Sequence, residues 1–489
     1  MPKDLLDDLK IDEFLRRFFD NPAQYATCEP ETIRNRNEIC QFLLRNETLT
    51  AALQRLYFVS LQIAEKGVAE EPIAIIQSMH GIRAFYDEAL AASQAIDACE
   101  ERPAIFKELS HGLRELLQEQ YPDGFTYLWE TYASGVQKPS SLSYDVRFQD
   151  DLSIASVSLS GVYNKRYTKL SFAGRVSGAP APMQVDSLLI LIPGYYTDAA
   201  VLLNPYRSTA SLKTLVEAVG KMLSIQTALV KNQIVTMNRK IAACIVELVE
   251  DLRFALGAVQ YAQTLRACTK FFCFAEIRES KEHSLCIKKM VHPLIAEREA
   301  AVANDVSIQN GEEMILLGGV NRGGKTVYLQ TMGAIQFLFQ MGLPIPAASA
   351  AISPVSGIFS VFSRDETAEM VQGKLGRELT ELRDSMAMLN ENSLFLGNEP
   401  ISGTSPEEST LLSREALCML KVKRARGIWV THLYELFDDV DKLNKLDFGS
   451  RFACMHTEST VGVQRSYVIL PGIPERHSGA KELFQRASV

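Results

Sequence analysis

The spacing of apolar residues changes along the chain. From about Asp12 to Gln120 they recur every three or four residues, as at Leu49, Leu53 and Leu56, with few glycines between them. The same spacing returns from about 211 to 267, in a stretch without proline and with two glycines. Both stretches predict helices, and a continuous helix over the second would be about 80 Å long.

Two other segments show different patterns. Between Ser140 and Pro205 apolar residues alternate partly with Ser, Gly and Thr, which predicts short strands. After Phe271 short apolar runs alternate with helical spacing. Strands and helices that alternate over about 200 residues are typical of a mainly parallel sheet covered by helices on both faces. The apolar runs of this segment are 314–317, 393–396, 428–430 and 467–470.

We therefore expect a multidomain protein, in which an all-α region with a small β-containing insert precedes an α/β domain. The predicted segments are a helical core at 1–140, the β-containing insert at 141–205, long helices at 206–270 and the α/β domain at 271–489.

Composition adds limits to this outline. The 489 residues are 47% hydrophobic, as in ordinary globular proteins. The acidic start has no apolar run typical of a signal peptide, and no segment offers the roughly 20 apolar residues of a membrane span, so a cytoplasmic location is expected. The nine cysteines form no C-x-x-C pair, which favours reduced thiols. A formal charge of −8 argues against a protein that coats nucleic acid through its overall field.

The clearest chemical signal is a glycine-rich segment after the run 314–317. Residues 318–326 read Gly-Gly-Val-Asn-Arg-Gly-Gly-Lys-Thr, which contains G-x-x-x-x-G-K-T between a predicted strand and a predicted helix. In that context the backbone N–H groups and the helix N-terminus can hold phosphate. We expect Gly319, Asn321, Gly323, Gly324, Lys325 and Thr326 to bind the nucleotide, with Lys325 on the β- and γ-phosphates and Thr326 on Mg²⁺. The alternative is a chance match in a glycine-containing loop.

Two further strand ends supply candidate groups for the same site. Asn398 and Glu399 end the run that begins at Ser393. Asn398 stands where an Asp normally helps to hold magnesium, and Glu399 can polarise the attacking water. A neutral amide lacks the charge that favours the metal, so hydrolysis is expected to be slow. His432 follows the run 428–430 and can contact the γ-phosphate or the water, although a single histidine is more often structural.

Basic residues gather in the predicted insert. Lys165, Arg166, Lys169 and Arg175 lie among Tyr163, Tyr167 and Phe172. A basic and aromatic hairpin can follow a phosphate backbone, which makes these residues candidate DNA contacts. A solvated strand face is the commoner explanation of such a pattern.

Taken in order, these motifs resemble the ATPase domain of the MutS family of DNA mismatch-repair proteins. The similar features are Gly-x-Asn-x-Gly-Gly-Lys-Thr, then Asn-Glu-x-x-x-Gly-Thr-Ser at 398–405, then Thr-His followed by Glu-Leu at 431–436. The resemblance covers roughly 280–489, and the segment from Ile33 to Asn37 is similar to the start of the family's core domain. It implies ATP and Mg²⁺ as cofactors, lever helices at 206–270 and a clamp-like insert.

The resemblance also implies a homodimer with nucleotide at the subunit interface, in which ATP binding drives clamp-like movement on DNA in mismatch repair or recombination. The family's Ser-Thr-Phe signature falls near 373–378, where this chain has no serine, and Lys374 or Arg377 is expected to supply charge in trans. The chain is expected to be a shortened form without the N-terminal mismatch-recognition domain.

A second interpretation is a nucleotide-gated scaffold or switch that hydrolyses ATP little or not at all and acts on a protein partner. Asn398, the altered signature and the acidic total charge favour it. A third, an ABC transporter subunit, is disfavoured because its signature motif is absent and half of the chain is predicted to be helical and soluble.

Overall fold

The computed structural model describes residues 4–66, 72–118, 141–148, 154–163, 166–176, 248–296, 298, 301–309, 313–363, 373–458 and 466–475. Its contacts divide the chain into two compact units, one of Met1–Arg45 with Phe254–Val489 and one of Asn46–Arg253. These units do not follow the four segments predicted from the sequence, whose boundaries remain predictions. None of the described helices is both long and apolar enough to cross a membrane.

The unit Asn46–Arg253 begins with three helices. They are α4 (Glu47–Lys66), α5 (Pro72–Asp97) and α6 (Ala104–Gln118), and α5 packs against both of the others. Leu53, Leu56 and Phe85 are buried between them, as the helical spacing of the apolar residues predicts. The helical character expected for this part of the chain is therefore confirmed.

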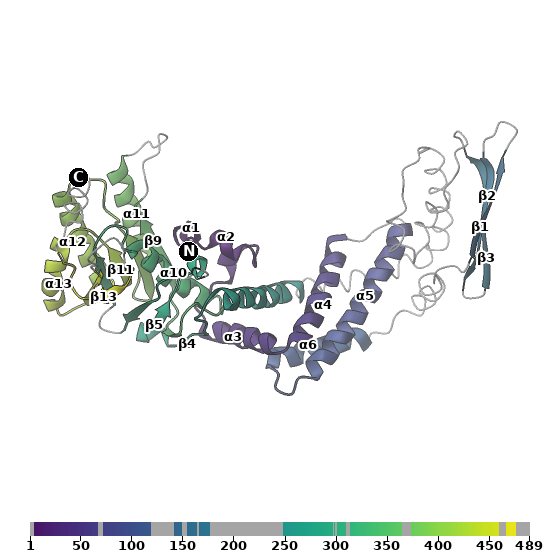
Figure 1. The fold of residues 1–489 in the computed structure, drawn as a ribbon, viewed down its shortest axis with the longest axis horizontal. Coiled ribbons are helices and arrows are strands. Elements are labelled where there is room, and N and C mark those ends of the chain that lie inside the picture. Colours follow the sequence, from purple (N-terminus) through teal and green to yellow (C-terminus); the bar gives the residue numbers. More distant parts are fainter. Residues whose placement is uncertain are drawn as a thin grey trace. The chain divides into compact units, whose positions relative to one another are not determined.

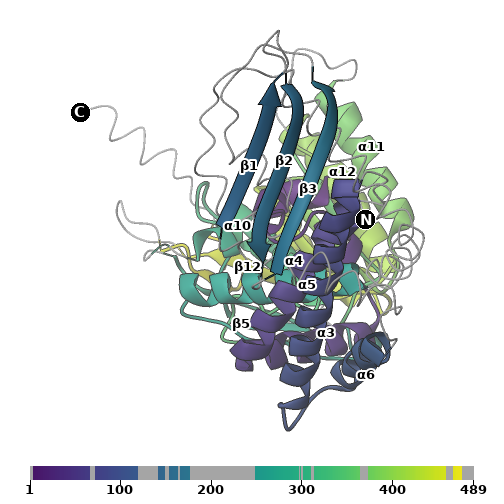
Figure 2. The same ribbon diagram turned by 90° about the vertical axis from the view of Figure 1, so that its right-hand side faces the viewer.

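Three strands follow in the same unit. β1 (Ser141–Phe148), β2 (Ile154–Tyr163) and β3 (Arg166–Val176) form an antiparallel sheet in the order β1-β2-β3, seen in Figure 2. Strands thus occur where the alternating pattern predicted them. Of the long helical stretch that follows, residues 248–268 are described and are helical, and the remainder lies outside the described residues.

The other unit contains a six-stranded sheet in the order β13-β12-β7-β11-β10-β9, labelled in part in Figure 1. Neighbouring strands are parallel except for β13, which runs antiparallel to β12. This is the mainly parallel sheet that the alternating pattern predicts. Its strands are β7 (Met314–Gly318), β9 (Gly357–Phe362), β10 (Ser393–Asn398), β11 (Arg426–Val430), β12 (Phe452–Thr457) and β13 (Ile469–Pro471).

Both faces of this sheet are covered, which explains why its strands are apolar throughout. Side chains alternate between faces along a strand. Leu317, Leu396 and Val430 lie in one buried cluster with α10 (Lys325–Gln340). Phe395 and Trp429 lie in a second cluster on the other face, which α11 (Lys374–Met388), α12 (Pro406–Val422) and α13 (Glu435–Lys445) complete.

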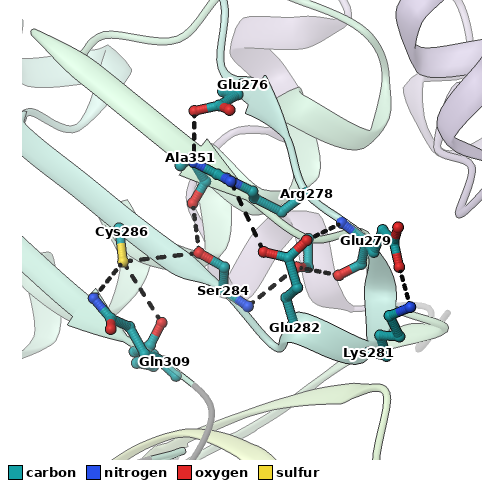
Figure 3. A network of polar contacts seen from close by, with 11 residues as sticks. Glu276, Arg278, Glu279, Lys281, Glu282, Ser284, Cys286, Gln309 and Ala351 are labelled. Atoms are coloured by element: carbon teal, nitrogen blue, oxygen red, sulfur yellow. Dashed lines mark hydrogen bonds and ion pairs between the residues drawn. The ribbon is translucent and has the colours of Figure 1, made fainter.

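A smaller sheet combines three strands that precede β7 in the chain with one, β8, that follows α10. Its four strands have the order β4-β8-β5-β6. Polar contacts join parts of this sheet and are shown in Figure 3. Ser284 Oγ donates to the Ala351 carbonyl at 3.2 Å, and Arg278 pairs with Glu276 at 3.0 Å. The strands are β4 (Glu276–Ile277), β5 (Leu285–Met290), β6 (Asn304–Ile308) and β8 (Ser349–Ile352).

The first residues of the chain form part of this C-terminal core. The short helices α1 (Leu5–Asp8) and α2 (Asp12–Leu15) precede α3 (Pro30–Arg45). Leu9 is fully buried, and its side chain lies so close to α10 that a Cβ on Gly333 would be 2.5 Å from it. Gln330 on α10 donates to the Asp8 carbonyl at 2.7 Å, and Ser360 on β9 donates to the Asp8 carboxylate at 2.7 Å. The N-terminal segment is therefore attached to the helix that follows the glycine loop.

We predict that Leu9→Ala lowers the free energy of unfolding of this unit by about 2–5 kcal/mol, because a buried side chain is lost and a cavity remains. Trp429 is buried in the sheet, so its fluorescence during urea unfolding, in a Trp129→Phe background, reports on this unit. The control is Leu411→Ala on α12, where the side chain is 59% exposed and the expected change is within about 0.5 kcal/mol. Equal effects of the two substitutions would contradict the assignment of Leu9 to the core.

Candidate nucleotide-binding site

The segment 318–326 forms a tight turn between the buried strand β7 and the helix α10. Gly319 has φ +118° and Gly324, directly before the helix, has φ +93°. Both values lie in the region that favours glycine. The segment, called the glycine loop below, thus has the strand, turn and helix start that the sequence predicted around it.

Thr457 at the end of β12 explains why two positions of the glycine loop have no side chain. A Cβ on Gly319 would lie 2.1 Å from Thr457 Oγ1, and one on Gly323 would lie 2.8 Å from Thr457 Cγ2. The Val320 N–H donates to the same hydroxyl at 3.2 Å. Thr457 therefore supports the loop from beneath, a role that the sequence analysis did not assign to it.

Lys325 is the first residue of α10 and points back into the glycine loop. Its side chain is 5% exposed, and Nζ donates to the carbonyl oxygens of Gly319 at 2.9 Å and Val320 at 3.1 Å. A buried ammonium group requires such acceptors. The contacts hold the charge of Lys325 inside the loop, where phosphate oxygens would replace the carbonyls.

The second residue of α10 meets the end of β10. Thr326 Oγ1 donates to Asn398 Oδ1 at 3.2 Å. Asn321, by contrast, is exposed on the loop. The structure thus brings together Thr326 and Asn398, the two residues expected to face the metal. Both present oxygen atoms, the ligand type that Mg²⁺ prefers, so the donor set fits the ion although it includes no carboxylate.

Glu399 and His432 are hydrogen-bonded to each other at the same edge of the sheet. Glu399 Oε1 lies 2.5 Å from His432 Nε2, and the Glu399 N–H donates to the Val430 carbonyl at 3.1 Å. Glu399 has φ +52°, an uncommon value for a residue other than glycine. From this position after β10 its side chain reaches His432, the second residue after β11.

The pKa of Glu399 reflects opposing influences. Burial opposes ionisation, but the hydrogen bond and charge of His432, with the charges of Lys325 and Lys374, outweigh it and lower the pKa below the ordinary value of 4.5. Because the folded-state pKa is lowered, the ionised carboxylate stabilises the fold above that ordinary value. The contribution is lost as the pH falls through the folded-state pKa. Glu399 is therefore held as a carboxylate at neutral pH, the form that can accept a proton.

The loop after Glu399 is fixed by Glu378 on α11. The Glu378 side chain is buried, and its carboxylate accepts hydrogen bonds from the backbone N–H groups of Ser402 at 2.9 Å and Gly403 at 2.8 Å. The Ser402 hydroxyl also donates to it at 2.7 Å. Sequence reasoning missed this role, because nothing in the local pattern of α11 indicates which backbone groups its carboxylate will meet.

The two cations predicted to act across a dimer lie on the same helix. Lys374 Nζ is 4.0 Å from Glu378, and its charge acts on Glu399 of the same chain. Arg377 pairs with Glu381 at 3.0 Å. Lys374 thus lies near the site within its own chain, and Arg377 is engaged along the helix. Their action in trans remains a prediction.

A cleft of about 160 Å³ opens beside Glu399 and His432. Thr431, Ser402 and Ser409 contribute hydroxyl groups to its wall. A cavity of this size has room for several water molecules, and these hydroxyl groups and the Glu399 carboxylate can bond to them. Water can therefore stand next to the Glu399 carboxylate.

The candidate DNA contacts are only partly described. Arg166, Lys169 and Arg175 lie on β3, and Lys165 lies outside the described residues. Contact with DNA at these four positions remains a prediction.

The fold and the site define a mixed α/β domain whose glycine loop faces polar groups from the neighbouring strand ends. Comparison with known proteins shows which family this domain resembles. Residues 315–481 match the family model of MutS domain V. The chain is also 29% identical over 240 residues to Endonuclease MutS2 of Ligilactobacillus salivarius. This match covers 48% of this chain and 28% of that protein. Endonuclease MutS2 of Bacillus velezensis is 27% identical over 245 residues, 49% of this chain and 29% of its own length.

These matches support the prediction from the motifs that this is a MutS-family protein. The match spans less than a third of the length of these curated relatives.

We predict that His432→Ala raises the pKa of Glu399 above that of the parent protein, because burial then acts with less opposition. Carbon NMR of Glu-labelled protein measures the titration, and the resonance is identified by its absence in Glu399→Gln. His111→Ala is the control, since His111 forms an exposed pair with Glu115 at 3.3 Å. An unchanged Glu399 titration in His432→Ala would contradict the pairing.

Proposed function

We propose that this chain is an ATP-dependent DNA-binding protein of the MutS type, with a P-loop NTPase site that binds ATP and Mg²⁺ and hydrolyses ATP slowly. The observation that carries the proposal is the convergence of Lys325 and Thr326 with Asn398, Glu399 and His432 at one edge of the sheet. The match to MutS domain V supports it.

Binding of the triphosphate relies on groups of the glycine loop. Phosphate oxygens take the place of the two carbonyl oxygens that Lys325 contacts, which exchanges neutral acceptors for charged ones. The start of α10 adds backbone N–H groups and the positive end of the helix dipole. Gly319 and Gly323 let the loop pack closely on Thr457, because a Cβ at either position would collide with that side chain.

Hydrolysis relies on the pair formed by Glu399 and His432. The Glu399 carboxylate accepts a proton from water in the adjacent cleft, and His432 orients the carboxylate and contacts the γ-phosphate. Magnesium supplies charge neutralisation of the phosphates when bound, and Thr326 with Asn398 would hold it. Asn398 brings no charge to this position, so we expect binding to exceed turnover.

The proposal also includes a dimer and contacts with DNA. Two chains would enclose the nucleotides, and Lys374 or Arg377 of each would approach the phosphates of the other. Arg166, Lys169 and Arg175 on β3, together with Lys165, would contact the DNA backbone. The family names given to the relatives support a role near DNA, and mismatch repair or recombination is the expected setting.

The central test separates binding from turnover. Glu399→Gln keeps the shape of the side chain but removes its basicity, so we expect hydrolysis to fall about 100-fold or more while ATP affinity is retained. Lys325→Ala is expected to weaken ATP binding about 10- to 100-fold, because a charge-assisted contact is lost. Steady-state hydrolysis and calorimetric titration measure the two effects.

Lys423→Ala is the matched control for Lys325→Ala, because Lys423 also donates to a backbone carbonyl, that of Leu389, at 3.1 Å but follows α12 instead of the loop. Unchanged hydrolysis in Glu399→Gln would remove the proposed role of Glu399. Unchanged ATP affinity in Lys325→Ala would contradict the site itself.

A second candidate function is a nucleotide-gated switch that acts on a protein partner with little or no hydrolysis. The observation that favours it is the neutral Asn398 beside Thr326, at the position where a charged ligand would favour the metal. ATP binding alone would then change the conformation of the chain.

DNA binding distinguishes the two candidates. A protein that contacts several phosphates loses affinity for DNA steeply as the salt concentration rises. If the chain is a DNA-binding protein, we expect it to shift duplex or branched DNA at low salt and to release it at about 200 mM salt. An electrophoretic shift assay with and without ATP measures this, using a variant with Arg166, Lys169 and Arg175 replaced by Gln as a comparison. If no DNA form binds at low salt in either condition, the switch is favoured and the DNA function is contradicted.

A further inference from the structure

A fully buried arginine lies at the start of β11. Arg426 is the first residue of this strand and is 0% exposed. β11 runs parallel to β7, and Gly427 is paired with Met314, the first residue of β7. Arg426 therefore lies at the edge of the sheet opposite the glycine loop, and any role of its guanidinium group is separate from the nucleotide site.

The guanidinium group of Arg426 uses one of its three nitrogen atoms in hydrogen bonds within the described part of the chain. Nη2 donates to the carbonyl oxygens of Ser353 at 3.2 Å and Pro354 at 3.0 Å. Nε and Nη1 are buried and have no hydrogen-bond partner. These two atoms carry three N–H groups, one on Nε and two on Nη1. Buried N–H groups nearly always have acceptors, so these groups require an acceptor that the described residues do not supply.

The charge of Arg426 also lacks a counter-charge among the described residues. None of their carboxylates forms an ion pair with it, and burial lowers the pKa of the guanidinium group to about 10. The group is therefore charged at neutral pH. Glu313 directly precedes β7 and is buried, but its carboxylate accepts the N–H of Arg451 at 3.2 Å. A buried charge costs much free energy unless an opposite charge lies close to it.

A second nitrogen without a partner lies on the segment beside Ser353. His283 Nδ1 is buried and has no hydrogen-bond partner. The next residue, Ser284, is joined to Ser353 twice: its N–H donates to Ser353 Oγ at 3.1 Å, and its carbonyl accepts the Ser353 N–H at 2.8 Å. Burial and then the charge of Arg426 lower the pKa of His283, so the ring is neutral at neutral pH. A neutral imidazole can carry its hydrogen on Nδ1 and donate from it.

We infer that Arg426 binds a small inorganic anion such as chloride, which accepts hydrogen bonds from Nε and Nη1 and from His283 Nδ1. Complete burial of Arg426 excludes an anion much larger than a water molecule. Water is the rival occupant, and Gln336 favours it: Nε2 donates to the same Ser353 carbonyl at 3.2 Å, and the buried Oε1 has no partner. The anion is the better occupant because these N–H groups outnumber this oxygen and because water brings no charge.

Thermal unfolding of the full chain tests this inference. Sodium chloride replaces sodium gluconate, whose anion is too large to be enclosed, at constant ionic strength, and Trp429 fluorescence in a Trp129→Phe background reports the transition. An anion that binds only the folded state stabilises it, so we expect the melting temperature to rise by about 2–8 °C from about 1 mM to about 300 mM chloride. Arg426→Met is expected to abolish this rise. Arg451→Met is the matched control and is expected to retain it, because Arg451 directly precedes β12 in the same sheet but is exposed.

A crystal structure of the parent chain grown with sodium bromide is a second measurement, and it decides the question if Arg426→Met does not fold. Bromide takes the place of chloride and is located by its anomalous scattering. We expect a peak within hydrogen-bond distance of Arg426 Nε and Nη1. Water alone at this position would overturn the inference. A melting temperature of the parent that does not respond to chloride, or a response that is unchanged in Arg426→Met, would overturn it as well.

Discussion

Hydrogen bonding between the parallel strands β7, β11 and β10 determines where each group of the site can lie. Leu317 is paired with Val430, and Val430 with Asn398, so the three strands end at the same edge of the sheet. The glycine loop continues from β7, His432 follows β11, and Glu399 follows β10. A shift of one strand by one residue would exchange its two faces and separate these groups. The buried apolar clusters on both faces oppose such a shift.

The polar groups of the site have partners within the chain. Lys325 contacts two loop carbonyls, Thr326 contacts Asn398, and Glu399 contacts His432. Lys325 is buried, and a buried ammonium group costs free energy unless it is hydrogen-bonded, which explains its two carbonyl acceptors. Under the proposed function a nucleotide would exchange these contacts for its own, and charged phosphate oxygens are better acceptors for Lys325 than neutral carbonyls. This exchange links occupancy of the site to α10, and α10 is bonded to the N-terminal segment through Gln330 and Asp8.

The parts of this arrangement that depend on local pattern could be predicted from the sequence. The apolar runs 314–317 and 393–396 are strands, and the glycines at 319 and 324 have the positive φ that a tight loop demands. The supporting residues could not be predicted, because their contacts join positions far apart in the chain. Thr457 meets Val320 across 137 residues, and Leu9 meets His292 across 283. The spacing of apolar residues does not indicate that the first helices complete the core around α10.

The proposed function depends on a triphosphate that lies in the glycine loop and replaces the carbonyls of Gly319 and Val320 as the partner of Lys325. A crystal structure of the full chain with Mg²⁺ and a non-hydrolysable ATP analogue tests this directly. The account predicts phosphate oxygens within hydrogen-bond distance of Lys325 Nζ, and the metal next to Thr326 and Asn398. A nucleotide bound elsewhere, with Lys325 still joined to Gly319 and Val320, would contradict it.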